Sequence, residues 1–392
     1  MKEVFLVSGA RTPVGSFNGT LSSYSAPKLG SFAIKEAVKR ASIKPDTIDE
    51  VIMGCVLQGG LGQAPARQAS LGAGIPSSVS CMTVNKVCGS GLKSVMLGAN
   101  EIQVGQSEIV VAGGMESMSN APYFLEKARH GYRMGNGKII DMMIHDGLWD
   151  PYGDKHMGNI GELCAKKYNL TREMQDEFAR QSYGKAQNAI KNGFFTEQIV
   201  PIEKKDKNGI THINEDEEPK KGNFEKAKGL KPAFDKEGTI TAYNASKIND
   251  GAAAVVIMSG EKVKELGLKP LAKIIAQATF SNDPDWFTTA PSYVIDKVCK
   301  NAQISKENID LFEINEAFAV VSLAVNQIAG LDNSKVNVTG GAIAFGHPIG
   351  MSGTRLLITL AYNLKRLDKK YGLATLCIGG GEAVAVIIEN LK

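Results

Sequence analysis

Val-Asn-Lys-Val-Cys-Gly-Ser-Gly-Leu-Lys-Ser-Val-Met-Leu-Gly occupies residues 84–98 and marks a point where a strand turns into a helix. Residues 78–84 alternate as a strand does, and apolar side chains after Cys88 recur at helical spacing. We expect the N–H groups and the positive dipole end of that helix to lower the thiol pKa of Cys88 and favour a nucleophilic thiolate. Gly89 and Gly91 are small enough to let a substrate approach the backbone. The alternative is that Cys88 is a buried, inert small hydrophobe.

Length and composition limit the classes of function. The 392 residues suit two or three domains, and 43% hydrophobic with 22% charged residues is typical of a globular protein. A net charge of +4 does not favour nucleic acid as a partner. Six widely scattered cysteines with no Cys-x-x-Cys pair predict neither a disulfide framework nor a zinc site. With no secretory leader and no apolar run of about 20 residues, we expect a cytoplasmic protein without a membrane partner.

Strands alternate with helices in both the first and the last third of the chain. This predicts an α/β fold with a buried, mostly parallel sheet. Both regions repeat the order strand, glycine loop and helix, which suggests an internally duplicated architecture. Residues 120–249 do not continue this regular alternation of strands and helices, and we interpret them as an inserted subdomain. Within them we expect a helical stretch over 162–192 and an exposed hairpin or loop over 204–218, with Asn208 and Gly209 at its turn.

Two polar residues follow predicted strands, where open α/β sheets bind ligands. Asn315 begins Asn-Glu-Ala-Phe and has the chemistry to hold a water or orient a histidine; its alternative role is to cap the next helix. His347 lies in Gly-His-Pro-Ile-Gly, where proline and the glycines hold the imidazole in a fixed place. The alternative for His347 is a purely structural histidine.

A second cysteine follows the last predicted strands. Cys377 precedes Ile378 and three glycines, including Gly379, whose backbone N–H groups are suited to stabilise an oxyanion. The alternative is a glycine-rich turn with an inert thiol.

Together these motifs resemble the thiolase family over essentially the whole chain. The matching segments are Val87-Cys-Gly-Ser-Gly, Gly113-Gly-Met-Glu-Ser-Met-Ser, His156-Met-Gly, Asn244-Ala-Ser, Asn249-Asp-Gly-Ala, Asn315-Glu-Ala-Phe, Gly340-Gly-Ala-Ile-Ala-Phe-Gly-His-Pro-Ile-Gly and Cys377-Ile-Gly-Gly-Gly. The resemblance implies two similar α/β halves, residues 1–119 with 250–270 and residues 271–392, which form a five-layered core. It also implies that 120–249 is a loop domain over the coenzyme A (CoA) site, and that the chain forms a homotetramer, or at least a dimer.

The resemblance is strongest to the short-chain, biosynthetic branch, which condenses two acetyl-CoA to acetoacetyl-CoA and CoA and runs backwards as thiolysis. It implies that Cys88 takes the acetyl group, that His347 is the base activating that thiol, and that Cys377 removes the α-proton of the second acetyl-CoA. Asn315 would hold a water beside His347, and the N–H groups of Cys88 and Gly379 would form a second oxyanion hole. No metal or redox cofactor is implied, since CoA is a substrate and product.

The resemblance also implies a set of CoA and acyl contacts. These are Ser246 and His156 at the pantetheine or thioester end, Met157, Leu148 and Phe234 as apolar walls, Phe287 at the closed end of the acyl pocket, and Lys220 near the phosphorylated ADP end. Packing alone would equally explain Leu148 and Phe234, and Lys220 also fits a solvated charge run. The chain departs from the family at Tyr243 and Lys247, where smaller residues are common, and at the bulky pair Trp286-Phe287.

Several competing functions remain open on the sequence. A broad-range degradative 3-ketoacyl-CoA thiolase would use the same residues with another pocket. A carrier-protein-dependent condensing enzyme would carry a Cys-His-His or Cys-His-Asn set instead, and a cysteine hydrolase would not need a second framed cysteine. An inactive acyl-CoA-binding relative is the alternative from a different class. Oxidation of Cys88 and Cys377 to a disulfide is a further hypothesis, concerning regulation.

Overall fold

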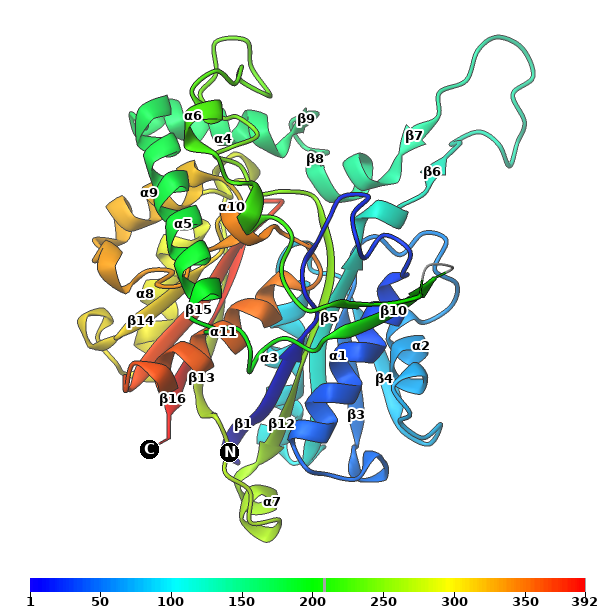
Figure 1. Ribbon diagram of the computed structural model, residues 1–392, viewed down its shortest axis with the longest axis vertical. Helices are drawn as coiled ribbons and strands as arrows, with labels where there is room; N and C mark the ends of the chain where they lie inside the picture. The colour runs from blue at the N-terminus through cyan, green and yellow to red at the C-terminus, as the bar shows by residue number, and fades with distance from the viewer. Residues whose placement is uncertain (207–208, 392) are drawn as a thin grey trace.

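The computed structural model describes residues 1–206 and 209–391, and most of its strands belong to one sheet (Figure 1). This ten-stranded sheet has the order β14-β15-β16-β13-β1-β12-β5-β3-β4, with β2 paired to β12. Its strands are β1 (Val4–Arg11), β2 (Gly15–Ser16), β3 (Glu50–Gly54), β4 (Ser80–Val84), β5 (Ile109–Ser117), β12 (Asn249–Ser259), β13 (Ala272–Ser281), β14 (Leu311–Ile314), β15 (Tyr371–Ile378) and β16 (Glu382–Asn390).

The sheet is mixed, so the expectation of a mostly parallel sheet is wrong. Strand β3 runs parallel to β4 and β5, and β14 runs parallel to β15. In each half, however, one inner strand is reversed: β12 is antiparallel to β1 and β5, and β16 is antiparallel to β13 and β15. The physical reason for β16 is its connection, because a tight glycine turn after β15 can only return the chain antiparallel.

Two halves meet where β1 pairs with β13. This antiparallel pairing covers three residues, from Val4 opposite Ile274 to Leu6 opposite Ala272. The N-terminal half thus contributes β1, β3, β4, β5 and β12, and the C-terminal half contributes β13 to β16. The predicted duplicated α/β architecture is confirmed, while the boundaries of the inserted region stay a prediction.

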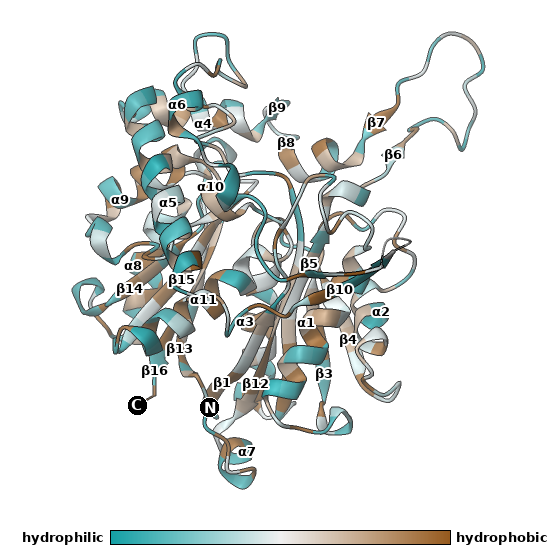
Figure 2. Ribbon diagram, in the orientation of Figure 1, coloured by the Kyte–Doolittle hydropathy of each residue, from teal (hydrophilic) through white to brown (hydrophobic). Residues whose placement is uncertain are grey.

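Helices cover both outer faces and fill the space between the halves. In the N-terminal half, α1 (Ala26–Arg40) and α2 (Pro65–Gly72) share a core with the outer face of the sheet. In the C-terminal half, α8 (Ala290–Ala302) and α9 (Ala319–Ala329) do the same. The result is the expected five-layered arrangement, with apolar strands inside and polar helix faces outside (Figure 2).

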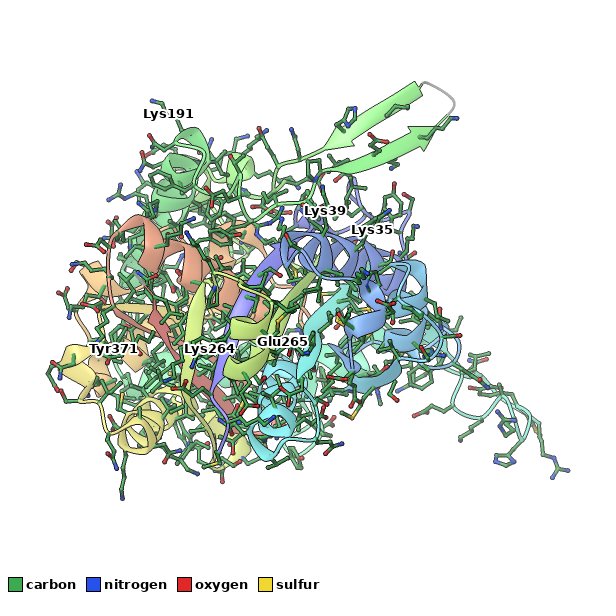
Figure 3. The ribbon with its side chains drawn as sticks, turned by 90° about the horizontal axis from the view of Figure 1, so that it is seen from below. Lys35, Lys39, Lys191, Lys264, Glu265 and Tyr371 are labelled. Carbon is green, nitrogen blue, oxygen red and sulfur yellow. The ribbon has the colours of Figure 1, made fainter. Side chains whose placement is uncertain are left out.

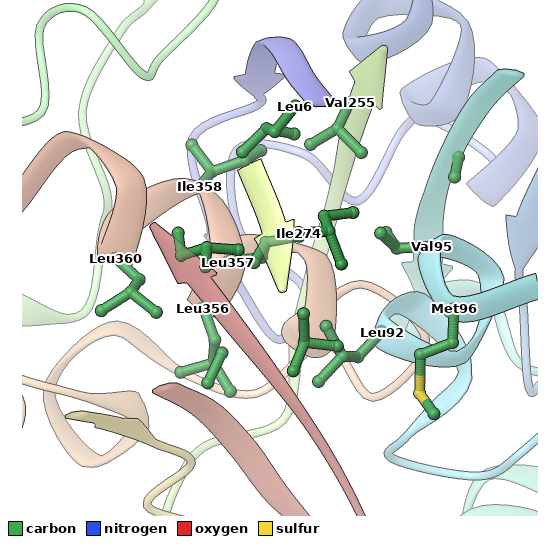
Figure 4. Close-up of a cluster of buried hydrophobic side chains, with 14 of the residues drawn as sticks. Leu6, Leu92, Val95, Met96, Val255, Ile274, Leu356, Leu357, Ile358 and Leu360 are labelled. Atoms are coloured by element: carbon green, nitrogen blue, oxygen red, sulfur yellow. The ribbon is translucent and has the colours of Figure 1, made fainter. Parts of the chain in front are cut away.

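The middle layer consists of α3 (Ser90–Val104) and α11 (Ser352–Arg366). Their apolar faces meet each other and the inner faces of both half-sheets in one core. Figure 4 shows this core from α3 residues Leu92, Val95 and Met96 to α11 residues Leu356, Leu357 and Leu360. Because both helices start beside the glycine-rich motifs, their packing sets the distance between those motifs.

Residues 120–249 form a set of small elements over one end of the sheet (Figure 1). They are β6 (Tyr123–Phe124), β7 (Ile140–Asp141), a π-helical turn (Met143–Leu148), β8 (Trp149–Asp150), β9 (Lys155–His156), α4 (Met157–Lys167), α5 (Arg172–Lys191), β10 (Ile202–Asp206), β11 (Gly209–Ile213) and α6 (Phe224–Ala227). Two short helices outside this region, α7 (Gly260–Glu265) and α10 (Ala342–Phe345), complete the fold.

The predicted helix over 162–192 is in fact two helices. Asn169 adopts a left-handed φ of 52°, which ends α4, and the Thr171 side chain accepts a hydrogen bond from the Met174 N–H at 3.3 Å and caps α5. The predicted hairpin is confirmed as β10 paired with β11, although its predicted turn residue Asn208 lies outside the described residues.

Charged side chains dominate the outside of the molecule. Figure 3 shows Lys35 and Lys39 on α1 and, at the edge of the molecule, Lys191 at the end of α5, with the β10–β11 hairpin and the segment between β6 and β7 projecting from the body. Among the described residues, none of the helices combines the length and the apolar character needed to cross a membrane.

Candidate active site

The turn before α3 presents Cys88. Val87 has a φ of +45°, which a β-branched residue rarely adopts. Ser90 holds this strained turn, because its hydroxyl accepts from the Lys86 N–H at 2.8 Å and donates to the Val87 carbonyl at 2.7 Å. The helix begins directly afterwards, with Gly89 as its N-cap, so Cys88 lies just outside the first turn as predicted.

The glycines around Cys88 make room for protein rather than for substrate, which corrects the sequence interpretation. A Cβ on Gly89 would lie 2.4 Å from Ile378 Cδ1, and one on Gly91 would lie 2.8 Å from the Gly350 carbonyl oxygen. Thr354 of α11 donates to the Gly91 carbonyl at 2.8 Å. These contacts bring the Cys88 turn against the loop that carries His347.

His347 is held in one tautomer by Ser352. The Ser352 hydroxyl donates to the Pro348 carbonyl at 2.9 Å, so it must accept from the His347 Nδ1–H, 2.5 Å away. This leaves Nε2 as the acceptor nitrogen of the ring. The His347 main-chain N–H donates to Asn249 Oδ1 at 3.0 Å, which fixes the loop as well as the ring.

Asn315 donates a hydrogen bond to this acceptor nitrogen of His347. Its Nδ2 lies 3.3 Å from His347 Nε2, and its buried Oδ1 accepts no hydrogen bond from the described residues. Helix α9 begins four residues later with Phe318 as its N-cap, so the alternative role of Asn315 as a helix cap is excluded.

A small, mostly apolar cavity of about 60 Å³ joins Cys88 and His347, whereas Asn315 lies behind His347 and does not line it. Eight residues predicted from the sequence line it: Cys88, Leu148, Met157, Ser246, Phe287, His347, Cys377 and Gly379. Its other walls are Val87, Gly147, Ala317, Phe318 and Ile349. Both cysteines therefore reach one site, although they come from different halves of the fold.

Three predicted contact residues lie outside this cavity. His156 caps α4 by accepting from the Gly158 N–H at 3.0 Å, and its ring stacks on Phe234 with centroids 4.7 Å apart. Phe234 in turn meets Phe318 edge to face, so this pair supports a wall of the cavity from behind. Lys220 is exposed and forms an ion pair with Glu215. The roles of these residues toward CoA stay predictions.

Burial controls the protonation of the three central groups. It raises the pKa of the Cys88 thiol to about 11, although the N–H groups of Gly379 and of Cys88 itself oppose the rise. The expected lowered pKa of Cys88 is therefore wrong for the unliganded protein, because desolvation outweighs the helix start. Burial, aided by the charge of Arg355, lowers the pKa of His347 to about 3. Burial and the nearby Cys88 raise the pKa of Cys377 well above its usual value.

These values make the resting site neutral. Near pH 7 both cysteines are thiols and His347 is an uncharged imidazole with Nε2 unprotonated. All six cysteines are free thiols. Within residues 1–206 and 209–391, no cluster of three or more His, Cys, Asp or Glu side chains is arranged to hold a metal ion.

Sequence reasoning missed the residues that support this site. Besides Ser352 and Asn249, Glu116 is fully buried and accepts from the N–H groups of Val56, Leu57 and Gly350 at 2.9 to 3.1 Å. Burial raises the pKa of Glu116 to about 7 despite these bonds. An acidic residue inside an otherwise apolar strand was the available signal, since a buried carboxylate needs several donors.

Comparisons with known proteins agree with this geometry. Residues 4–261 match the family model described as the N-terminal domain of thiolase, and residues 268–390 match the one described as its C-terminal domain. The chain belongs to the thiolase family. Thiolase relatives include an acetyl-CoA acetyltransferase from Cupriavidus necator, 54% identical with both chains covered in full, and one from Schizosaccharomyces pombe, 52% identical over 99% of each chain. A crystal structure of the Bacillus anthracis acetyl-CoA acetyltransferase has a TM-score of 0.98 at 43% identity, covering 100% of this chain and 99% of that one.

Proposed function

We propose that this thiolase is an acetyl-CoA acetyltransferase, which condenses two acetyl-CoA to acetoacetyl-CoA and CoA and catalyses the reverse thiolysis. The observation that carries the proposal is the convergence of two thiols and one neutral imidazole on a single small cavity. The names of full-length relatives at about half identity support the same reaction. An inactive acyl-CoA-binding protein would not need this set of reactive groups.

The first half-reaction transfers an acetyl group to Cys88. In the resting site the pKa values of about 11 for Cys88 and about 3 for His347 oppose proton transfer between them. His347 Nε2 therefore takes the thiol proton in concert with attack of the sulfur on the acetyl-CoA carbonyl, which forms a tetrahedral intermediate. Its collapse breaks the bond to the CoA sulfur, and the departing CoA thiolate takes the proton of Cys377. The raised pKa of Cys377 suits this step, since the group is protonated at rest and can act as an acid.

The second half-reaction forms the carbon–carbon bond. The Cys377 thiolate left by the first step removes the α-proton of a second acetyl-CoA, and the resulting enolate attacks the acetyl-Cys88 carbonyl. Collapse of this intermediate releases acetoacetyl-CoA and the Cys88 thiolate, which takes back its proton from protonated His347. Every proton is returned, so the net reaction is two acetyl-CoA to acetoacetyl-CoA and CoA.

Two sets of donors are available for the oxyanions. The N–H groups of Cys88 and Gly379 already converge on the Cys88 sulfur, next to where the intermediate oxygen would form. Protonated His347, with a water bound by Asn315, is suited to the enolate oxygen. Each well-placed donor is worth about 3 kcal/mol of barrier lowering. The chemistry draws on these groups and calls for no metal or redox cofactor.

The cavity supports a short acyl chain as the substrate. Phe287 lines it and is 2% exposed, so the ring closes one wall. Its neighbour Trp286 lies against Lys167, whose Nζ is 3.8 Å from a Trp286 ring centroid, and Trp286 is not a lining residue. A broad-range degradative thiolase would need space for longer chains at this wall.

A homotetramer, as a dimer of dimers, is the assembly we propose. The sheet ends at β4, whose edge is exposed at Met82, and an unpaired edge favours pairing with a second copy. The projecting segment between β6 and β7 carries exposed apolar side chains, including Met134 at 92% and Ile139 at 71% exposure. Light scattering on the purified protein tests this assembly.

We further propose a cytoplasmic location, supported by a 51% identical Gibberella zeae relative whose name describes it as cytosolic.

The deciding experiment is CoA-dependent consumption of acetoacetyl-CoA by the purified protein, repeated with a six-carbon 3-ketoacyl-CoA. Turnover confined to the four-carbon substrate is the expected result. Equal use of both substrates would assign the chain to the degradative thiolases. A folded protein that binds CoA without turnover would overturn the proposal.

A further inference from the structure

Lys247 stands next to the cavity at a position where the chain departs from its family. It follows the lining residue Ser246 directly, and its side chain is only partly buried. The ammonium group does not extend into solvent. It donates to the Ala245 carbonyl at 2.5 Å and to the Ile343 carbonyl at 3.4 Å.

The second of these contacts crosses to the segment that leads to His347. Ile343 lies in α10, and its N–H donates to Glu316 Oε2 at 3.2 Å. The backbone of Ile343 is thus held at its N–H by a carboxylate and at its carbonyl by an ammonium group. Glu316 is fixed in turn by the Ser182 hydroxyl at 2.6 Å and Asn337 Nδ2 at 2.9 Å.

An aromatic face lies on another side of the ammonium group. Lys247 Nζ is 5.7 Å from the centroid of the Tyr183 ring, which stacks on Tyr243 with centroids 5.3 Å apart. The carboxylates of Glu218 and Glu316 favour its charge, but burial outweighs them and lowers the Lys247 pKa to about 8. Two carbonyls and one aromatic face match the three N–H donors of a lysine.

The main chain of Lys247 makes a further connection. Its carbonyl accepts from the His347 N–H at 3.2 Å, while the Ser246 N–H donates to the Ala317 carbonyl at 2.9 Å. Lys247 therefore contacts the His347 segment through both its backbone and its side chain.

We propose that Lys247 is a positioning residue, whose ammonium group braces the 244–247 turn against residues 342–347 and so fixes the relative positions of Ser246 and His347, which both line the cavity. The inference rests on the proposed function for the role of His347 as the base. Lys247 itself touches no reacting atom. It acts by fixing the two loops between which the thioester must lie.

The test compares Lys247→Met, which keeps most of the apolar stem, with Lys247→Ala and Lys247→Arg. We expect kcat/KM for thiolysis to fall about tenfold to a hundredfold in the Met and Ala variants, because small displacements of a catalytic base are costly. Lys247→Arg should retain most activity. Added methylammonium should raise the kcat/KM of Lys247→Ala at least threefold. Tetramethylammonium, which has no N–H donor, should leave it unchanged.

Lys297→Ala is the matched control. Lys297 Nζ also donates to a backbone carbonyl, that of Thr279 at 2.8 Å, but it is exposed on α8 and remote from the cavity. This variant should keep wild-type kinetics with every additive. Unchanged kinetics in Lys247→Met, or a loss in Lys247→Ala that methylammonium does not relieve, would overturn the inference.

Hydrogen exchange separates this inference from the proposed function. Peptides covering 342–347 should exchange about tenfold faster in Lys247→Ala and regain protection with methylammonium, whether or not the protein turns over substrate. Inactive wild-type protein would overturn the proposed function alone. Unchanged hydrogen exchange of residues 342–347 in Lys247→Ala would overturn the proposal that Lys247 positions this segment.

Discussion

The turns that carry Cys88 and Cys377 place the same side chain in two different settings. Cys88 lies in a strained turn before a helix, is partly accessible through the cavity, and has two backbone N–H donors on its sulfur. Cys377 lies at the end of β15, paired with Ala383 of β16, and is 1% exposed. The first setting suits a nucleophile that must hold an acyl group, and the second suits a thiol that only moves a proton.

Backbone geometry maintains this difference. The turn after Cys377 contains Gly380 and Gly381 with φ of +88° and +86°, which a residue with a side chain rarely adopts. A Cβ on Gly381 would lie 2.4 Å from the Asn282 carbonyl oxygen at the end of β13. Both turns contribute to the cavity, but the Cys377 turn joins two paired strands of the sheet, whereas the Cys88 turn leads into a helix.

The largest expected effect separates the two thiols by their tasks. Cys88→Ser and Cys377→Ser should each lower kcat by about 10³-fold or more, because each removes a group on which the others depend. Intact mass spectrometry after incubation with acetyl-CoA should find an acetyl group on Cys377→Ser but none on Cys88→Ser. Cys299→Ser, in α8 and away from the cavity, should behave as wild type. Acetylation of the Cys88→Ser protein would contradict the assignment of Cys88 as the acyl acceptor and of Cys377 as the group that moves a proton.

Alkylation of the unliganded protein tests the protonation of Cys88. With a pKa of about 11, its thiolate fraction should grow tenfold per pH unit, so the iodoacetamide rate at Cys88 should rise about a hundredfold from pH 7 to pH 9. His347, with its pKa lowered to about 3, stays neutral over this range and should add no inflection. Peptide mapping assigns the modified cysteine. A plateau already reached at pH 7 would contradict the raised pKa.

A smaller effect is expected from the group that orients the histidine. Ser352→Ala removes the acceptor of the His347 Nδ1–H and frees the ring to adopt the other tautomer. We expect kcat/KM to fall about tenfold to a hundredfold with little change in thermal stability. Ser322→Ala is the control, since this buried serine in α9 has a hydroxyl without a partner among the described residues. Equal activities of the two variants would remove Ser352 from the mechanism.

The smallest expected effect comes from Phe287, which lines the cavity that both thiols reach. Phe287→Leu shortens a lining side chain and should raise the ratio of six-carbon to four-carbon 3-ketoacyl-CoA turnover by about tenfold or less. Phe280→Leu changes a nearby aromatic residue that stacks on Tyr293 and does not line the cavity, so its ratio should stay unchanged. An unaltered ratio in Phe287→Leu would show that another wall sets the chain length.

Local sequence motifs, together with the family resemblance they carry, were sufficient to nominate candidate reacting residues. Cys88, Asn315 and Cys377 lie at or just after the ends of strands, and such patterns depend on near neighbours in the chain. The strand predicted before His347 is wrong, because helix α10 directly precedes this residue. The β10–β11 hairpin and the alternation of strands and helices were predictable for the same reason. The break at Asn169 was missed because a helical spacing of apolar residues continues across it.

Other features depend on contacts between distant segments, which only the tertiary structure determined. The reversed strands β12 and β16 follow from sheet topology, the pKa of Cys88 from burial by both halves, and the glycines at 89 and 91 from packing against residues 350 and 378. From the sequence, Lys247 is only a bulky departure from the family pattern. The structure shows that its ammonium group donates a hydrogen bond to the Ile343 carbonyl. The sequence by itself determined which side chains are candidates for the chemistry, because these lie in short motifs. The structure determined their protonation and distances, because desolvation and close packing are properties of the folded core.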